Sequence, residues 1–215
     1  MIQTTKSPKL LHTAFLLSLI TIGYNLLEGA VSIWLGYADD TLALFGFGVD
    51  SFVEVLSGLG IAHMVQRMKH HPIESQDIFE VRALKITGTA FYILTIGLVA
   101  GAFLSIYQGL QPETTQGGIV ISIISILTMY FLYRKKLNVG KALDSAPIVS
   151  DAHCTKTCFY LSFILLASSL LYELFAVPYV DAIGSLGIAW YAFKEGKEAF
   201  EKAQTKNLSC SDDCC

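Results

Sequence analysis

Charged residues are scarce in this sequence: Asp, Glu, Lys and Arg make up only 15% of its 215 residues, whereas 53% are hydrophobic. A soluble domain normally contains about 25% charged residues. The formal net charge of −3 lacks the positive excess that proteins use to bind nucleic acids. The sequence also has no glycine-rich phosphate loop or other nucleotide motif. The composition therefore argues against a soluble domain, a nucleic-acid partner and ATP-driven transport by this chain alone.

The few charges are clustered, and long apolar segments lie between them. A helix of roughly 20 apolar residues crosses a bilayer, and a helix satisfies its own backbone hydrogen bonds in lipid. The first segment is too long for a cleaved signal peptide. We therefore predict an all-α, polytopic membrane protein whose partner is the lipid bilayer. Its six transmembrane helices are expected at about 10–36, 42–66, 86–110, 117–133, 146–175 and 178–193.

The basic residues indicate the orientation of these helices. Three of the predicted loops, "YADD", "QPETTQ" and "AVPY", contain no Lys or Arg. The positive-inside rule then places both termini and the other two loops in the cytoplasm, which accounts for fourteen of the fifteen cations. The exception, Lys156, lies inside the fifth segment. We expect a cytoplasmic N-terminus (1–9), a transmembrane domain (10–195) and a cytoplasmic tail (196–215) of a multi-pass protein of the cell (plasma or inner) membrane.

Two acidic residues lie in the middle of the second predicted helix. Asp50 and Glu54 are four residues apart, so they share one helical face. Two buried carboxylates on one face repel each other unless a proton or a cation lies between them. No Lys or Arg lies near them at that depth, so a bound cation is favoured over pairing with a basic residue or with water.

Two cysteines have the same spacing in the fifth predicted helix. Cys154 and Cys158 could hold one soft metal ion from a single helical face. The alternative is that they are small hydrophobic residues of the core. A disulfide between them is disfavoured, because helical geometry directs the two sulfur atoms poorly.

The two pairs are expected at the same depth. At a rise of 1.5 Å per residue, Asp50 and Glu54 lie roughly 14 and 20 Å below the outer boundary. Cys154 and Cys158 lie roughly 14 and 20 Å above the inner boundary of a core about 30 Å thick. Depth would place Asp50 nearer Cys158 and Glu54 nearer Cys154. The sequence therefore predicts a site with two oxygen and two sulfur ligands.

The stretches that contain these pairs, "TLALFGFGVDSFVE" and "SAPIVSDAHCTKTC", resemble the cation diffusion facilitator family. In that family, a His/Asp pair on the second helix faces another pair on the fifth helix and binds a divalent ion. "NLLEG" and "YVDAIGSLGIAWYAF" fit the same family. The resemblance covers roughly residues 10–200. It implies efflux of a divalent cation by alternating access, in exchange for protons, by a transporter rather than an enzyme.

This sequence departs from the family pattern at several positions. Cysteines replace the His and Asp of the fifth helix, Glu replaces the second acid of the second helix, and Phe47 replaces an acid that usually precedes that pair. We do not expect the cytoplasmic ferredoxin-like domain that usually dimerises the family, and a homodimer is one arrangement that the resemblance allows. Thiolates favour Zn²⁺, Cd²⁺, Hg²⁺ or Pb²⁺ over Mg²⁺, Ca²⁺ or Mn²⁺. The expected cargo is Zn²⁺, Cd²⁺ or another thiophilic ion, and no prosthetic group is expected.

Several other residues are weaker candidates for the site. His153 and Asp151 precede the cysteine pair and are candidates for supporting it. The tail "CSDDCC" contains Cys210, Cys214 and Cys215, which either capture thiophilic ions or form an unstructured end.

Other polar residues have expectations of their own. Lys156 is expected to face away from the site, toward an acid or a cavity near Glu28. Asn25 and Glu28 either line the cytoplasmic entrance or form hydrogen bonds between helices. The histidines near the second loop are expected to be solvated rather than to form a second metal site; they are His63, His70 and His71.

Two other classes of function remain open from the residues alone. One is a membrane protein that binds or senses metal without moving it. The other is a membrane thiol oxidoreductase that uses Cys154 and Cys158. The oxidoreductase fits poorly, because such enzymes favour Cys-x-x-Cys pairs near a membrane surface.

Overall fold

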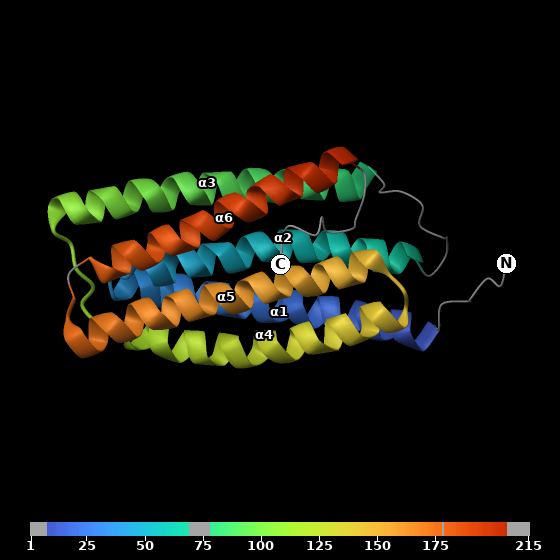
Figure 1. Ribbon diagram of the computed structural model, residues 1–215, viewed down its shortest axis with the longest axis horizontal. Helices are drawn as coiled ribbons and strands as arrows, with labels where there is room; N and C mark the ends of the chain where they lie inside the picture. The colour runs from blue at the N-terminus through green and yellow to red at the C-terminus, as the bar shows by residue number, and fades with distance from the viewer. Residues whose placement is uncertain (1–7, 69–77, 178, 206–215) are drawn as a thin grey trace.

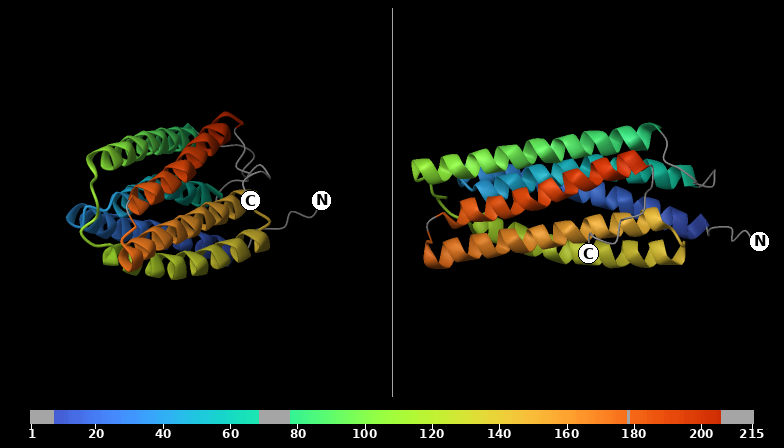
Figure 2. Two further views of the ribbon diagram at one scale, coloured as in Figure 1. Left: turned by 60° about the vertical axis from the view of Figure 1, so that its left-hand side comes forward. Right: turned by 45° about the horizontal axis from the view of Figure 1, so that its top comes forward.

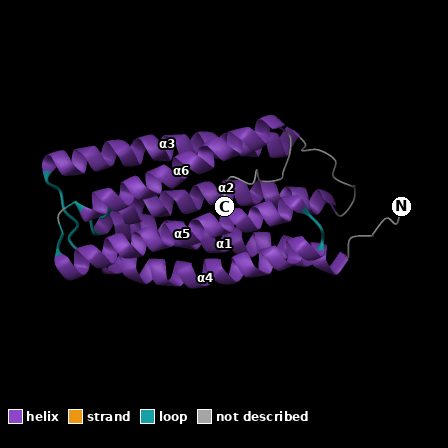
Figure 3. Ribbon diagram, viewed as in Figure 1, coloured by secondary structure: helices purple, strands orange, loops and turns teal. Residues whose placement is uncertain are grey.

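Six long helices form the protein in the computed structural model, which describes residues 8–68, 78–177 and 179–205. Within these residues the regular structure is helical throughout (Figure 3). Successive helices run antiparallel, so α1 begins at the end of the bundle where α6 finishes (Figure 1). The helices are α1 (Pro8–Ala38), α2 (Leu42–Met68), α3 (Ile78–Gln108), α4 (Gln116–Ala142), α5 (Ala146–Phe175) and α6 (Val180–Thr205).

Five of the six helices, α1 to α5, are long and apolar enough to cross a membrane. Their outward faces carry large exposed hydrophobic side chains such as Ile93, Ile96 and Phe103, which suit contact with lipid. The helix α6 is less apolar because its second half carries several Lys and Glu residues. The prediction of an all-α, six-helix, multi-pass membrane protein is confirmed.

Three of the predicted helix boundaries are wrong, and all three helices are longer than predicted. The helix α4 continues to Ala142, although the sequence predicted its end near residue 133. Arg134, Lys135, Lys136 and Lys141 therefore lie on a helix and not in a loop. Similarly, α6 extends to Thr205, and α3 already begins at Ile78. Apolar length marks only the part of a helix that needs lipid, because a helix continues into water wherever it still packs against a neighbour.

The helices pack most closely in three pairs: α1 with α2, α3 with α6, and α4 with α5. The pair α3 and α6 lies on one side of the bundle, and α4 and α5 lie on the other (Figures 1 and 2). Small residues bring α1 and α2 together: a Cβ atom added at Gly36 would lie 2.5 Å from the backbone N of Phe45. Close approach through glycine is a common way for helices to associate in membranes.

The short connections α1–α2, α3–α4 and α5–α6 lie at one end of the bundle (Figure 1). We call this the outer end and the opposite one the inner end, following the orientation predicted from the basic residues.

Two apolar clusters lie on either side of a polar layer, and a third, smaller cluster consists of Met129, Leu132 and Cys158. The outer cluster includes Phe47 of α2 and Leu161 of α5, and the inner cluster includes Met64 of α2 and Ile148 of α5. Both predicted ligand pairs fall between these positions along α2 and α5. The core therefore places the acidic and sulfur side chains in the middle of the bundle.

Candidate metal site

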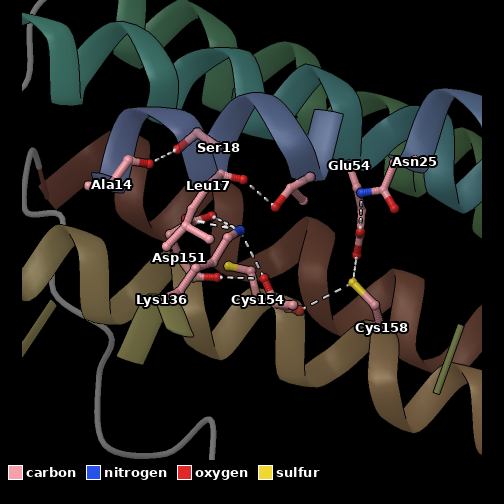
Figure 4. A network of polar contacts seen from close by, with 11 residues as sticks. Ala14, Leu17, Ser18, Asn25, Glu54, Lys136, Asp151, Cys154 and Cys158 are labelled. Atoms are coloured by element: carbon pink, nitrogen blue, oxygen red, sulfur yellow. Dashed lines mark hydrogen bonds and ion pairs between the residues drawn. The ribbon is translucent and has the colours of Figure 1, made fainter. Parts of the chain in front are cut away.

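Glu54 connects three helices in this polar layer. One of its carboxylate oxygens, Oε2, accepts a hydrogen bond of 3.1 Å from Asn25 Nδ2 on α1. Its other oxygen, Oε1, accepts a hydrogen bond from the thiol of Cys158 on α5. Figure 4 shows Asn25, Glu54 and Cys158 in a continuous chain of contacts. One carboxylate thus joins α1, α2 and α5.

The contact between Glu54 and Cys158 differs from the pairing expected from depth. The sequence predicted Glu54 nearer Cys154 and Asp50 nearer Cys158. The helices are tilted relative to one another (Figure 2), so equal rise along two helices does not mean equal depth. The pairing is shifted by about one helical turn.

Asp50 is buried, with only 3% of its surface exposed. Within the described part of the chain, its Oδ1 atom has no hydrogen-bond partner. A buried carboxylate oxygen without a partner is costly, and a bound proton or cation would remove that cost. Asp50 precedes Glu54 by one turn on the same face of α2.

Cys154 lines a cavity of ≈ 40 Å³ together with Glu54, Glu195 of α6 and Asp151. The volume is large enough for a water molecule or an ion, since a water needs about 10–15 Å³ by this measure. Cys154 and Cys158 are both free thiols, and Cys158 is the more deeply buried. Two of the four predicted ligands, Glu54 and Cys158, are therefore in contact, and a third shares a cavity with Glu54.

The four predicted ligands do not form one cluster in the structure. Across residues 8–68, 78–177 and 179–205, no three His, Cys, Asp or Glu side chains lie close enough together to hold a metal ion as they stand. The complete set of Asp50, Glu54, Cys154 and Cys158 stays a prediction. To align the two pairs as predicted, α2 would have to shift against α5 by about one helical turn, about 5.4 Å.

Asp151, a weaker candidate, forms a buried ion pair with a lysine. The ammonium of Lys136 lies 3.0 Å from Asp151 Oδ2 and 3.1 Å from its Oδ1. Lys136 also donates to the hydroxyl of Thr155, at 3.0 Å. Asp151 and Lys136 lie side by side in Figure 4. Asp151 is thus engaged by α4.

His153 and Lys156 lie away from this cluster. The His153 ring is 6.3 Å from the ring of Tyr133 on α4, measured between centroids. The ammonium of Lys156 lies 5.6 Å from the centroid of the Tyr160 ring, within the range of a cation–π contact. Neither residue lines the cavity that Glu54 and Cys154 share.

Asn25 and Glu28 form hydrogen bonds between helices, one of the two roles expected for them. Glu28 accepts from Tyr24 at 2.7 Å and from Ser51 of α2 at 3.2 Å. Asn25, besides contacting Glu54, lines the cavity as well. Both residues therefore tie α1 to α2 beside the acidic pair.

Some candidates cannot be placed. Cys210, Cys214 and Cys215 lie outside the described residues, as do His70 and His71. His63 is described, and its ring lies 4.5 Å from that of Phe79. The roles predicted for the tail stay predictions.

Two residues of the polar layer were missed from the sequence. The fourth helix was predicted to end at residue 133, which left Lys136 outside it. Glu195 was overlooked because it lies beyond residue 193, where the sixth helix was predicted to end. The buried positions Ile188, Ala192, Ala199 and Ala203 of α6 recur at helical spacing. That periodicity shows that α6 continues past the apolar run and carries Glu195 into the bundle.

Comparison with known proteins gives matches over most of the chain. Residues 14–204 match the family described as the cation efflux transmembrane domain. An uncharacterised transporter of Methanocaldococcus jannaschii is 26% identical over 175 residues, which is 80% of this chain and 62% of the relative. The manganese efflux system protein MneP of Bacillus subtilis is 25% identical over 193 residues, which is 84% of this chain and 64% of that protein. The chain thus spans less than two thirds of the length of both relatives.

Proposed function

We infer the function of this chain from its family. The chain belongs to the cation efflux family, the cation diffusion facilitators, as its sequence motifs predicted. Members of this family transport divalent metal cations across membranes and are not enzymes. We infer that this chain exports a thiophilic divalent cation, Zn²⁺ or Cd²⁺, from the cytoplasm across the cell membrane. The ion would bind among Asp50, Glu54, Cys154 and Cys158.

The observation that carries this proposal is the contact between the Cys158 thiol and the Glu54 carboxylate. A sulfur atom and a carboxylate oxygen from different helices meet between the outer and inner apolar clusters, and Cys158 also packs against Met129 and Leu132. A metal ion that replaced the thiol proton would bind both atoms. Asp50 and Cys154 lie one turn away on the same two helices, on opposite sides of this contact. We propose that α2 shifts against α5 by about one turn to align the two pairs, which would give a tetrahedral set of four ligands that suits Zn²⁺.

The cysteines also support a choice of metal. One relative is named for manganese efflux, and Mn²⁺ prefers carboxylate and other oxygen ligands. Thiolates favour Zn²⁺ and Cd²⁺ instead. We therefore propose that this chain differs from that relative in its preferred cargo.

Proton exchange follows from the ligand chemistry. Cysteine must lose its proton to bind a metal, and so must any protonated carboxyl group. Metal binding from the cytoplasm would release protons, and protons from outside would compete for the same ligands and release the metal. The proposed cycle moves metal out and protons in, as the helices open the site to each side in turn.

Metal uptake into proteoliposomes tests the proposal. Wild type would be compared with Cys154→Ser/Cys158→Ser for Zn²⁺, Cd²⁺, Hg²⁺ and Mn²⁺. Cys210→Ser/Cys214→Ser/Cys215→Ser is a control that removes the same type of side chain outside the bundle. We expect uptake of the soft ions by the wild type and by the control, and its loss in the double variant.

Two results would contradict the proposal. Stoichiometric metal binding by the wild type without any flux would indicate a metal-binding or sensing protein. Equal soft-metal uptake with and without Cys154 and Cys158 would exclude the thiols as ligands. A pH-sensitive dye inside the same vesicles would test the coupling, since antiport requires proton movement opposite to the metal.

A further inference from the structure

Lys136 is buried on α4 beside the proposed site, with 2% of its surface exposed. Its ammonium donates to both oxygens of Asp151, at 3.0 and 3.1 Å, and to Thr155 Oγ1 at 3.0 Å. A lysine ammonium has three N–H donors, and these three acceptors satisfy them. A buried charge is stable when it is paired in this way. Lys136 is therefore a fixed part of the polar layer.

Asp151 is well placed to be a metal ligand itself. It precedes Cys154 by three residues and Cys158 by seven, so all three lie on one face of α5. Asp151, Cys154 and Glu54 also line the same cavity. However, Lys136 engages both carboxylate oxygens of Asp151. The residue that would supply a third carboxylate is thus held by an internal cation.

We propose that Lys136 determines metal specificity by keeping Asp151 out of the ligand set. This inference rests on the proposed function. With Asp151 held back, the ion meets two carboxylates and two thiols, and the thiols dominate the choice of metal. A third carboxylate would add the oxygen ligands that Mn²⁺ prefers over thiolate.

Lys136 also contributes to the charge of the cavity. The lining residues include three carboxylates, from Glu54, Asp151 and Glu195, and one ammonium, which leaves a formal charge of −2. Loss of the ammonium would increase the attraction for every divalent cation. Uptake of one metal alone is therefore a poor test, whereas the ratio between a hard and a soft metal reports the type of ligand.

The test measures the competition between Mn²⁺ and Zn²⁺, as uptake into proteoliposomes and as equilibrium binding to the purified full chain. In Lys136→Met, we expect the preference for Mn²⁺ relative to Zn²⁺ to rise about tenfold, an effect of the size that residues behind metal ligands have. Lys135→Met is the matched control, because it removes the neighbouring, exposed lysine of α4. In Lys136→Met/Asp151→Asn, the ratio should return to the wild-type value.

A purely structural role for the ion pair would lower uptake of both metals and leave their ratio unchanged in Lys136→Met. That result would overturn the inference and leave the proposed function intact, because the wild type would still transport. Absence of any metal uptake by the wild type would overturn both. If Lys136→Met does not fold, the metal ratio is measured in the double variant. That variant should fold, because neutral residues often replace a buried ion pair without loss of stability. A raised Mn²⁺ preference in the double variant, which lacks the Asp151 carboxylate, would contradict the inference.

Discussion

The outer end of the bundle and its polar layer use carboxylates for different purposes. At the outer end, carboxylates bind helix ends. Asp181 of α6 accepts from the backbone N–H groups of Leu42 and Ala43, at 2.8 and 3.3 Å. These are orphan donors in the first turn of α2, and a negative charge there is favoured by the helix dipole. Asp181 thus closes α6 onto the start of α2.

Glu173 of α5 has the same role for α4. Its Oε2 accepts from the backbone N–H of Thr115 at 3.1 Å, and its Oε1 accepts from the side chain of Gln116 at 3.0 Å. The loops are also joined, because the N–H of Glu113 donates to the carbonyl of Asp39 at 3.0 Å. The outer end is held by acids whose oxygens are used by protein donors.

In the polar layer, by contrast, Asp50 and Glu54 each have an oxygen that no N–H group of the described chain engages, although Glu54 Oε2 accepts from Asn25 and Asp151 is held by Lys136. Asp50 has an oxygen without a partner in the described chain, and Glu54 receives the thiol of Cys158. Oxygens left available in this way are suited to exchange protons and cations. From this comparison we propose that the outer acids stabilise the fold whereas Asp50 and Glu54 serve transport, and each prediction below tests one side of it.

The largest effect is expected from Glu54→Gln, which removes the charge and keeps the size of the side chain. Metal uptake should fall by at least about 100-fold, beyond the range seen for residues behind metal ligands. The measurement is Zn²⁺ flux into proteoliposomes at matched protein content. Glu173→Gln, the same change at the outer end, is the control and should transport normally. Equal loss in both variants would remove the distinction between the two regions.

An intermediate effect is expected from Asp181→Ala. The variant loses the acceptor for two N–H groups of α2, which should lower the free energy of unfolding by about 1 kcal/mol, as for a lost helix cap. Thermal unfolding in detergent measures this change. Equilibrium Zn²⁺ affinity, measured on the same sample, should stay unchanged. A loss of affinity without a loss of stability would place Asp181 in the transport machinery.

The smallest effect is expected from Tyr172→Phe. The hydroxyl of Tyr172 donates to the carbonyl of Pro112 at 2.7 Å and joins α5 to the loop before α4. Its removal should cost about 0.5–1.5 kcal/mol of stability, the usual net value of one hydrogen bond. The melting temperature reports the change, and flux should be retained. A variant with wild-type stability but no flux would show that this outer contact matters for the cycle rather than for the fold.

The sequence was sufficient to predict the six helices and the presence of acids and cysteines in the middle of the bundle. Hydrophobic length and residue spacing along a single helix carry that information. It did not predict that Glu54 meets Cys158, because the pairing depends on how α2 and α5 tilt against each other. Nor did it predict the ion pair of Lys136 with Asp151. That contact requires α4 to continue past its apolar run, which depends on packing between helices.

The most direct test of the central claim is X-ray absorption spectroscopy of Zn²⁺ bound to Cys210→Ser/Cys214→Ser/Cys215→Ser. In this variant, Cys154 and Cys158 are the only cysteines that remain. We predict two sulfur ligands at about 2.3 Å and oxygen ligands at about 2.0–2.2 Å. A zinc ion surrounded only by oxygen or nitrogen ligands would contradict the proposed site and the soft-metal preference that rests on it.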